Sequence, residues 1–201
     1  MNNEILYLLL PDFASHEIVY LSQAIASDEC ALKENPKYIN KIVAPSLEPV
    51  KSISGFRTLP DYSFETMPDD YAALVLIGGF GWSTPTAEPV VEIVGHAIEQ
   101  GRIVGAICNG ASFMAKCGFL NAVRHTGNGR DQLKLWGGDN YTNLDGYIDA
   151  QAVSDRNIVT ANGSASLEFA RELLLLLEND TPERIEMYYQ FNKQGFCKLF
   201  G

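Results

Sequence analysis

The chain has 201 residues, of which 46% are hydrophobic and 20% are charged, and its formal net charge is −10. This composition is typical of a globular protein with a substantial core, and we expect one domain over residues 1–201. The acidity argues against a broad surface for nucleic acids or anionic membranes. No apolar run approaches the roughly 18 residues that cross a bilayer.

The cysteines are scattered along the chain and form no CxxC or Cys/His spacing typical of a metal site. They are Cys30, Cys108, Cys117 and Cys197. We therefore expect no metal and no cofactor. The start of the chain has no basic segment before its short apolar run, which indicates a first strand rather than a secretion signal. We expect a cytoplasmic protein in which Cys108 is a free thiol.

Apolar runs and helical spacings alternate along the chain. A buried strand over 5–10 precedes a helix from Phe13, with Glu17 in its first turn. A short strand over 41–44 and a hairpin over 50–59 follow. The remaining expected strands are 74–77, 103–107, 147–153 and 157–160, and the remaining expected helices are 90–98, 111–116, 167–177 and 182–190, with an irregular stretch over 134–141. This alternation predicts an α/β fold with a largely parallel sheet.

The stretch from Ile103 to Ser112 contains the strongest sign of chemistry. A buried strand ends at Cys108, Asn109-Gly110 allow a sharp turn, and a helix follows, which is the layout of a nucleophile elbow. A thiol beside a helix N-terminus is favoured as thiolate. A buried structural cysteine at a strand end is the alternative, and this stretch alone leaves both open.

Two other turns are expected near Cys108, because ligands bind beyond the carboxyl ends of parallel strands. One holds Glu17, which by itself indicates only a favourable interaction with a helix dipole. The other is Gly78-Gly79, whose glycines either expose N–H groups or simply permit a tight turn. A carboxylate, a glycine turn and a thiol at one sheet edge favour a functional site.

The motif 106–111 (AICNGA), with Leu76-Ile77-Gly78-Gly79 before it and Arg124-His125-Thr126 after it, resembles the ThiJ/PfpI superfamily. The resemblance extends to Glu17 and to residues 158–163 (IVTANG), and so covers nearly the whole chain. It implies the flavodoxin-like three-layer fold of class I glutamine amidotransferases, with helices on both faces of the sheet. It also implies a reactive Cys108, a protonated Glu17 bonded to its sulfur, and an oxyanion pocket from the N–H groups of Gly79 and Asn109.

One departure from that pattern concerns the base. Hydrolytic members place a histidine directly after the cysteine or late in the chain, whereas this chain has Asn109 and no late histidine, so glutaminase activity is not expected. Members resembling the Parkinsonism-associated deglycase carry a histidine near the position of His125. That residue is either the base or a loop histidine bonded to backbone. Further candidate pocket residues are Gly78, Phe80, Trp82, Asn162 and Gly163.

These features predict a cysteine-dependent enzyme acting on a small carbonyl or amide compound, glyoxalase-, deglycase- or hydrolase-like. The alternative is a redox-sensing stress protein whose Cys108 is oxidised without turnover. A glutamine amidotransferase-like subunit is a third and weaker reading. The resemblance also implies a homodimer, with a small-molecule substrate as the other partner.

Overall fold

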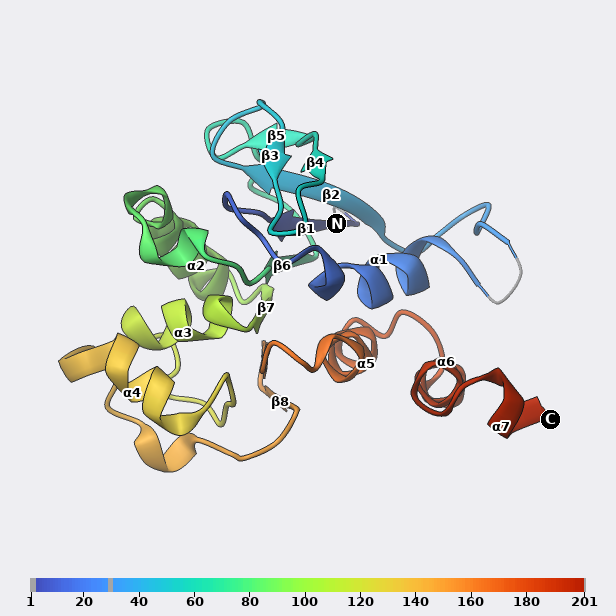
Figure 1. The fold of residues 1–201 in the computed structure, drawn as a ribbon. Helices are drawn as coiled ribbons and strands as arrows, with labels where there is room; N and C mark the ends of the chain where they lie inside the picture. Colours follow the sequence, from blue (N-terminus) through green and yellow to red (C-terminus); the bar gives the residue numbers. More distant parts are fainter. Residues whose placement is uncertain (1–2, 29–30, 201) are drawn as a thin grey trace.

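The computed structural model describes residues 3–28 and 31–200, so Cys30 lies outside the described residues. Seven strands form one sheet in the order β5-β2-β1-β6-β7-β9-β8 (Figure 1). All neighbouring strands run parallel except β8, which is antiparallel to β9. The strands are β1 (Glu4–Leu8), β2 (Ile39–Ala44), β5 (Tyr62–Ser63), β6 (Ala73–Leu76), β7 (Ile103–Ile107), β8 (Ala152–Asp155) and β9 (Ile158–Ala161). The predicted hairpin is a separate pair, β3 (Val50–Lys51) and β4 (Arg57–Thr58).

Helices cover both faces of the sheet, as expected of a doubly wound fold. In Figure 1, α2 (Val90–Glu99), α3 (Asn109–Lys116) and α4 (Arg130–Gly137) lie on one side. On the other side lie α1 (Val19–Ala26), α5 (Ser166–Leu176) and α6 (Pro182–Gln194), with α7 (Phe196–Phe200) beyond them. Each helix layer packs on its own hydrophobic cluster, and the central strands β1, β6, β7 and β9 contribute to both. The predicted α/β class with a mostly parallel sheet is confirmed.

The register of the central strands brings their carboxyl ends to one edge. Leu8 pairs with Leu76, Leu76 with Ala106, and Ile107 with Ala161. The turns that follow β1, β6, β7 and β9 therefore emerge side by side at this edge.

The structure differs from the sequence prediction in several segments, and β5 and α7 were not predicted at all. The first helix is preceded by a 3₁₀ turn, η1 (Ser15–Glu17), which holds Glu17. Residues 147–151 form a loop rather than the start of a strand, since β8 begins at Ala152. The stretch 134–141, expected to be irregular, includes the second half of α4, a helix of which only Leu133 and Gly137 are buried. A helix with so few apolar positions gives little periodicity, and its packing against α3 provides the stabilisation.

Four short 3₁₀ turns complete the described elements. They are η2 (Gly81–Ser83), η3 (Pro85–Ala87), η4 (Gly138–Asn140) and η5 (Leu144–Gly146). Within the described ranges, the chain contains no helix with the length and apolar character that crossing a membrane requires.

Candidate active site

Cys108 occupies the single residue between the end of β7 and the start of α3. Its backbone has φ 57° and ψ −125°, a conformation that costs a non-glycine residue on the order of 1–3 kcal/mol. Hydrogen bonds on both sides hold it there: its N–H donates to Ala161, and its carbonyl accepts from the N–H groups of Ala111 and Ser112. This is the geometry of a nucleophile elbow, which the sequence predicted.

Glu17 lies directly behind the cysteine and is 2% exposed. Its Oε2 accepts a hydrogen bond of 2.6 Å from the Gly78 N–H. A Cβ atom on Gly78 would lie 2.5 Å from the Cys108 Cβ and 2.7 Å from the Glu17 Oε2. Any larger residue at position 78 would overlap the Glu17 carboxyl and the Cys108 side chain, which explains why this turn has a glycine there.

Burial raises the pKa of Glu17 to about 7, against the opposing effects of the Gly78 N–H, the nearby His16 and the Cys108 side chain. Burial also raises the pKa of the Cys108 thiol, and negative charge on Glu17 raises it further. A Glu17 carboxylate and a Cys108 thiolate would repel each other at this short range, so ionisation of one group opposes ionisation of the other. A protonated Glu17 removes one of the two effects that raise the pKa of Cys108, but burial still raises it, so the thiolate that the sequence predicted to be favoured beside the helix N-terminus is disfavoured here.

The Cys108 sulfur meets a polar neighbour on its other side. The Asn128 Nδ2 donates to the sulfur at 3.3 Å, and the Asn128 Oδ1 accepts from the Gly163 N–H at 2.8 Å. A Cβ on Gly163 would lie 2.9 Å from the sulfur, so this glycine lets the loop after β9 approach it. His16, which is exposed, lies 3.2 Å through its Nε2 from the Gly163 carbonyl.

Asn109 and Gly79, the predicted oxyanion residues, lie beside each other next to the cysteine. The Asn109 Nδ2 donates to the Gly79 carbonyl at 2.9 Å, and the Asn109 Oδ1 accepts from Gln132. Its backbone N–H is directed at the Cys108 sulfur and lowers the pKa of the thiol. Among the described residues, the Gly79 N–H meets no acceptor. The side chain of Asn109 thus ties the Gly79 turn to α4, while the oxyanion role itself stays a prediction.

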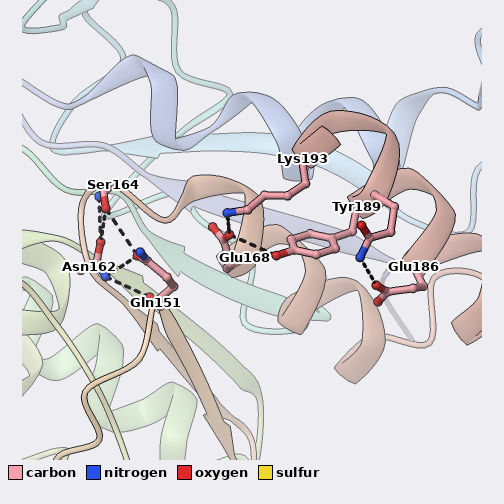
Figure 2. A network of polar contacts seen from close by, with 8 residues as sticks. Gln151, Asn162, Ser164, Glu168, Glu186, Tyr189 and Lys193 are labelled. Carbon is pink, nitrogen blue, oxygen red and sulfur yellow. Dashed lines mark hydrogen bonds and ion pairs between the residues drawn. The ribbon is translucent and has the colours of Figure 1, made fainter. Parts of the chain in front are cut away.

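An open cleft of about 600 Å³ leads to the sulfur. Polar and small residues from 127–132, 147–150 and 162–164 line it together with Cys108, and Asp149 is the charged side chain among them. Figure 2 shows how one wall is held: the Asn162 amide donates to Gln151, and the Asn162 Oδ1 accepts from both the N–H and the hydroxyl of Ser164. Asn162 and Gly163, which the sequence analysis offered as pocket residues, both line this cleft.

His125 does not reach this cleft, contrary to its prediction as the base. The ring is fully buried, with Nδ1 2.8 Å from the Val123 carbonyl and Nε2 2.5 Å from the Tyr141 hydroxyl. Burial lowers the pKa of His125, so the neutral ring is the stable form in the core. Both nitrogens already have partners, which is the structural alternative that the sequence left open.

Two predicted pocket residues are also placed elsewhere. Trp82 is 1% exposed, donates its indole N–H to the Ile77 carbonyl and packs on Phe113 with ring centroids 4.8 Å apart. Phe80 is 62% exposed and is not among the residues that line the cleft. The glycine turn directs the chain after β6 away from the sulfur, so these aromatic rings pack or face solvent instead.

The sequence missed Asn128 and Gln132 as individual site residues, as well as Tyr147 and Asp149. All lie in the segment 126–149, where no motif distinguishes one polar residue from the next. The available signal was the position of this segment after Arg124-His125-Thr126. The described part of the chain contains no group of three His, Cys, Asp or Glu side chains arranged to bind a metal.

Comparisons with known proteins agree on one family. The model of the DJ-1/PfpI family matches residues 3–176. The Bacillus subtilis protein named uncharacterized protease YdeA is 36% identical over 201 residues, covering 98% of this chain and 95% of the relative. The Caenorhabditis elegans protein named glutathione-independent glyoxalase DJR-1.2 is 31% identical over 141 residues, covering 69% and 72%.

Solved structures show the same likeness. The thiJ/pfpI family protein from Bacillus anthracis superposes with a TM-score of 0.91 at 29% identity, over 100% of this chain and 94% of that one. The DJ-1 superfamily protein Atu0886 from Agrobacterium tumefaciens superposes with a TM-score of 0.83 at 33% identity, over 96% and 99%.

Proposed function

This chain belongs to the DJ-1/PfpI family, and from that premise we propose that it is an enzyme in which Cys108 adds to a small carbonyl compound, a 2-oxoaldehyde being the first to test. The observation that carries the proposal is the strained Cys108 at the end of an open cleft, in contact with a buried carboxyl whose pKa is about 7. Strain, burial and a shifted pKa at one position favour chemistry over packing.

The first step follows from the protonation of the pair. With Glu17 neutral, the Cys108 thiolate donates an electron pair to the carbonyl carbon and forms a C–S bond. The carbonyl π pair moves onto oxygen, and the resulting alkoxide takes a proton from water in the cleft, which leaves a thiohemiacetal. N–H donors from Gly79 and Asn109 would stabilise the charge while it is on the oxygen.

The relatives are named for two different activities, protease and glyoxalase. Peptide hydrolysis requires a group that protonates the departing amine, a role that imidazole fills in cysteine and serine proteases. Among the described residues no imidazole hydrogen-bonds the Cys108 sulfur: the His16 Nε2 lies against the Gly163 carbonyl, and His125 has both nitrogens occupied. Addition to a 2-oxoaldehyde produces no amine that must be protonated. The thiohemiacetal becomes a 2-hydroxy thioester when a proton moves from C1 to C2, and water then releases the 2-hydroxy acid and returns the Cys108 thiol. The site supports that reaction better.

The test compares wild-type protein with Cys108→Ser on a 2-oxoaldehyde, following loss of the aldehyde and appearance of the 2-hydroxy acid. We expect turnover in the wild type and loss of it in the variant. Cys197→Ser, at an exposed cysteine of α7, is the matched control and should retain full activity. Equal turnover by Cys108→Ser would contradict the proposal. Stoichiometric oxidation of Cys108 by mild peroxide, without turnover of any carbonyl, would favour the redox-sensing alternative.

A further inference from the structure

The side-chain amide of Asn128 is oriented by the backbone. Gly163 offers an N–H, which can only donate, so the amide oxygen must face Gly163, and it does so at 2.8 Å. The amide nitrogen then necessarily faces the other way and lies 3.3 Å from the Cys108 sulfur. An amide nitrogen can only donate, so the acceptor in this contact is the sulfur, and a thiolate accepts more strongly than a thiol.

Asn128 contacts the Cys108 sulfur from a different side than Glu17 does. Glu17 approaches it from the protein interior, whereas Asn128 lies on the side of the cleft. The glycine at 163 brings its own backbone against the sulfur and serves as the anchor for the amide. No other side-chain amide among the described residues donates to this sulfur. Although Asn128 is exposed, its amide is held by partners from two other chain segments, Cys108 and Gly163.

We propose that Asn128 is a catalytic residue whose amide holds the Cys108 thiolate in place for attack. The inference deepens the proposed function and rests on it for the reaction. The amide transfers no proton, so the hydrogen bond only stabilises the anion and fixes the direction of its lone pairs before the C–S bond forms.

Loss of the Asn128 donor changes the rate of attack by Cys108 in opposite directions below and above the pKa of the thiol. Loss of a donor to the thiolate raises the pKa of Cys108, which lowers the thiolate fraction at pH values below the midpoint. A thiolate of higher pKa is intrinsically more nucleophilic, with a Brønsted coefficient of about 0.4–0.5. If the pKa of Cys108 rises by about one unit, the rate of attack falls about threefold at pH values below that pKa and rises about threefold at pH values above it.

The experiment measures the rate of Cys108 alkylation by iodoacetamide from pH 6 to pH 11.5, resolved by mass spectrometry of the Cys108 peptide, so that the range extends above the raised pKa of the thiol. The variants are Asn128→Ala and Asn128→Asp, because aspartate keeps the size of the side chain and an acceptor for Gly163 while it removes the donor. Asn157→Ala is the control, since Asn157 is exposed and donates to Gly101 at the other end of the sheet.

We expect the Asn128→Ala profile to cross that of the wild type, slower at low pH and faster at high pH, and Asn128→Asp to shift the midpoint further upward. Asn157→Ala should follow the wild type. Profiles of both Asn128 variants that coincide with the wild type would overturn the proposal, and so would a uniform loss of rate at every pH, which indicates misfolding or blocked access.

The same proteins then separate this inference from the proposed function. If the profiles cross but wild-type protein turns over no carbonyl compound, the proposed reaction fails while the contact with the thiolate stands. If wild-type protein turns over a 2-oxoaldehyde and Asn128→Ala matches its kcat and KM at pH 7, the assignment of Asn128 as a catalytic residue fails.

Discussion

Replacement of Glu17 by glutamine isolates the energetic consequence of burying this carboxyl. Glutamine keeps an oxygen for the Gly78 N–H and places an N–H₂ group where the protonated carboxyl faces Cys108. The native carboxyl retains its proton up to a pKa of about 7, whereas a free glutamate releases it near 4.5. A folded-state pKa above the unfolded one gives stability that is present below pH 4.5 and is lost as pH rises to about 7.

The size of this loss follows from the separation of the two pKa values. At 1.36 kcal/mol per pH unit, it amounts to about 3 kcal/mol between pH 4.5 and pH 7.5. Glu17→Gln carries no titrating group there, so its free energy of unfolding relative to the wild type should rise by about that amount over the same range. His125, whose pKa is lowered by burial, contributes stability that is lost as pH falls, but equally in both proteins.

The assay is urea denaturation of both proteins under reducing conditions at half-unit steps from pH 4.5 to pH 7.5. The same pair in a Cys108→Ser background removes the titration of the thiol. Glu65→Gln, at an exposed glutamate, is the control and should show no such trend. The quantity that decides is the difference in free energy of unfolding between Glu17→Gln and wild type. If this difference changes by less than about 0.5 kcal/mol from pH 4.5 to pH 7.5, Glu17 is not a buried neutral acid and the reasoning about the pair is refuted.

Three further changes test the surroundings of the pair. Gly78→Ala should lower stability by about 1–3 kcal/mol in urea denaturation and slow alkylation of Cys108, because the added carbon overlaps both functional side chains. Tyr141→Phe should cost a similar 1–3 kcal/mol by leaving His125 without its partner. Because His125 has no role in the cleft, that variant should leave the rate of Cys108 alkylation unchanged, and a slowed rate would restore the histidine as a site residue. Asp149→Asn should raise kcat/KM for a 2-oxo acid about fivefold relative to a neutral 2-oxoaldehyde, because a charge pair about 4 Å apart in water is worth about 1 kcal/mol. Equal ratios in wild type and variant would show that Asp149 does not act on the substrate.

The sequence by itself determined the sheet, the elbow and the glycine turn of this protein. Strands such as 74–77 and 103–107 are continuous apolar runs because they are buried on both faces. Such a run is visible in the sequence whichever residues pack against the strand. The turn at Cys108 is equally local, since a strand, one residue and a helix leave little conformational choice. Glu17 was found because parallel strands deliver their following turns to one edge.

Only the tertiary structure decided which polar side chains meet the sulfur. His125 and Asn128 are three residues apart in one loop, and their sequence neighbourhood does not distinguish a core histidine from a residue of the cleft. The choice depends on where Tyr141 and Gly163 lie, and these come from elements far along the chain. The same holds for the shifted pKa of Glu17, because burial is the sum of contacts from several elements and leaves no pattern around the glutamate itself.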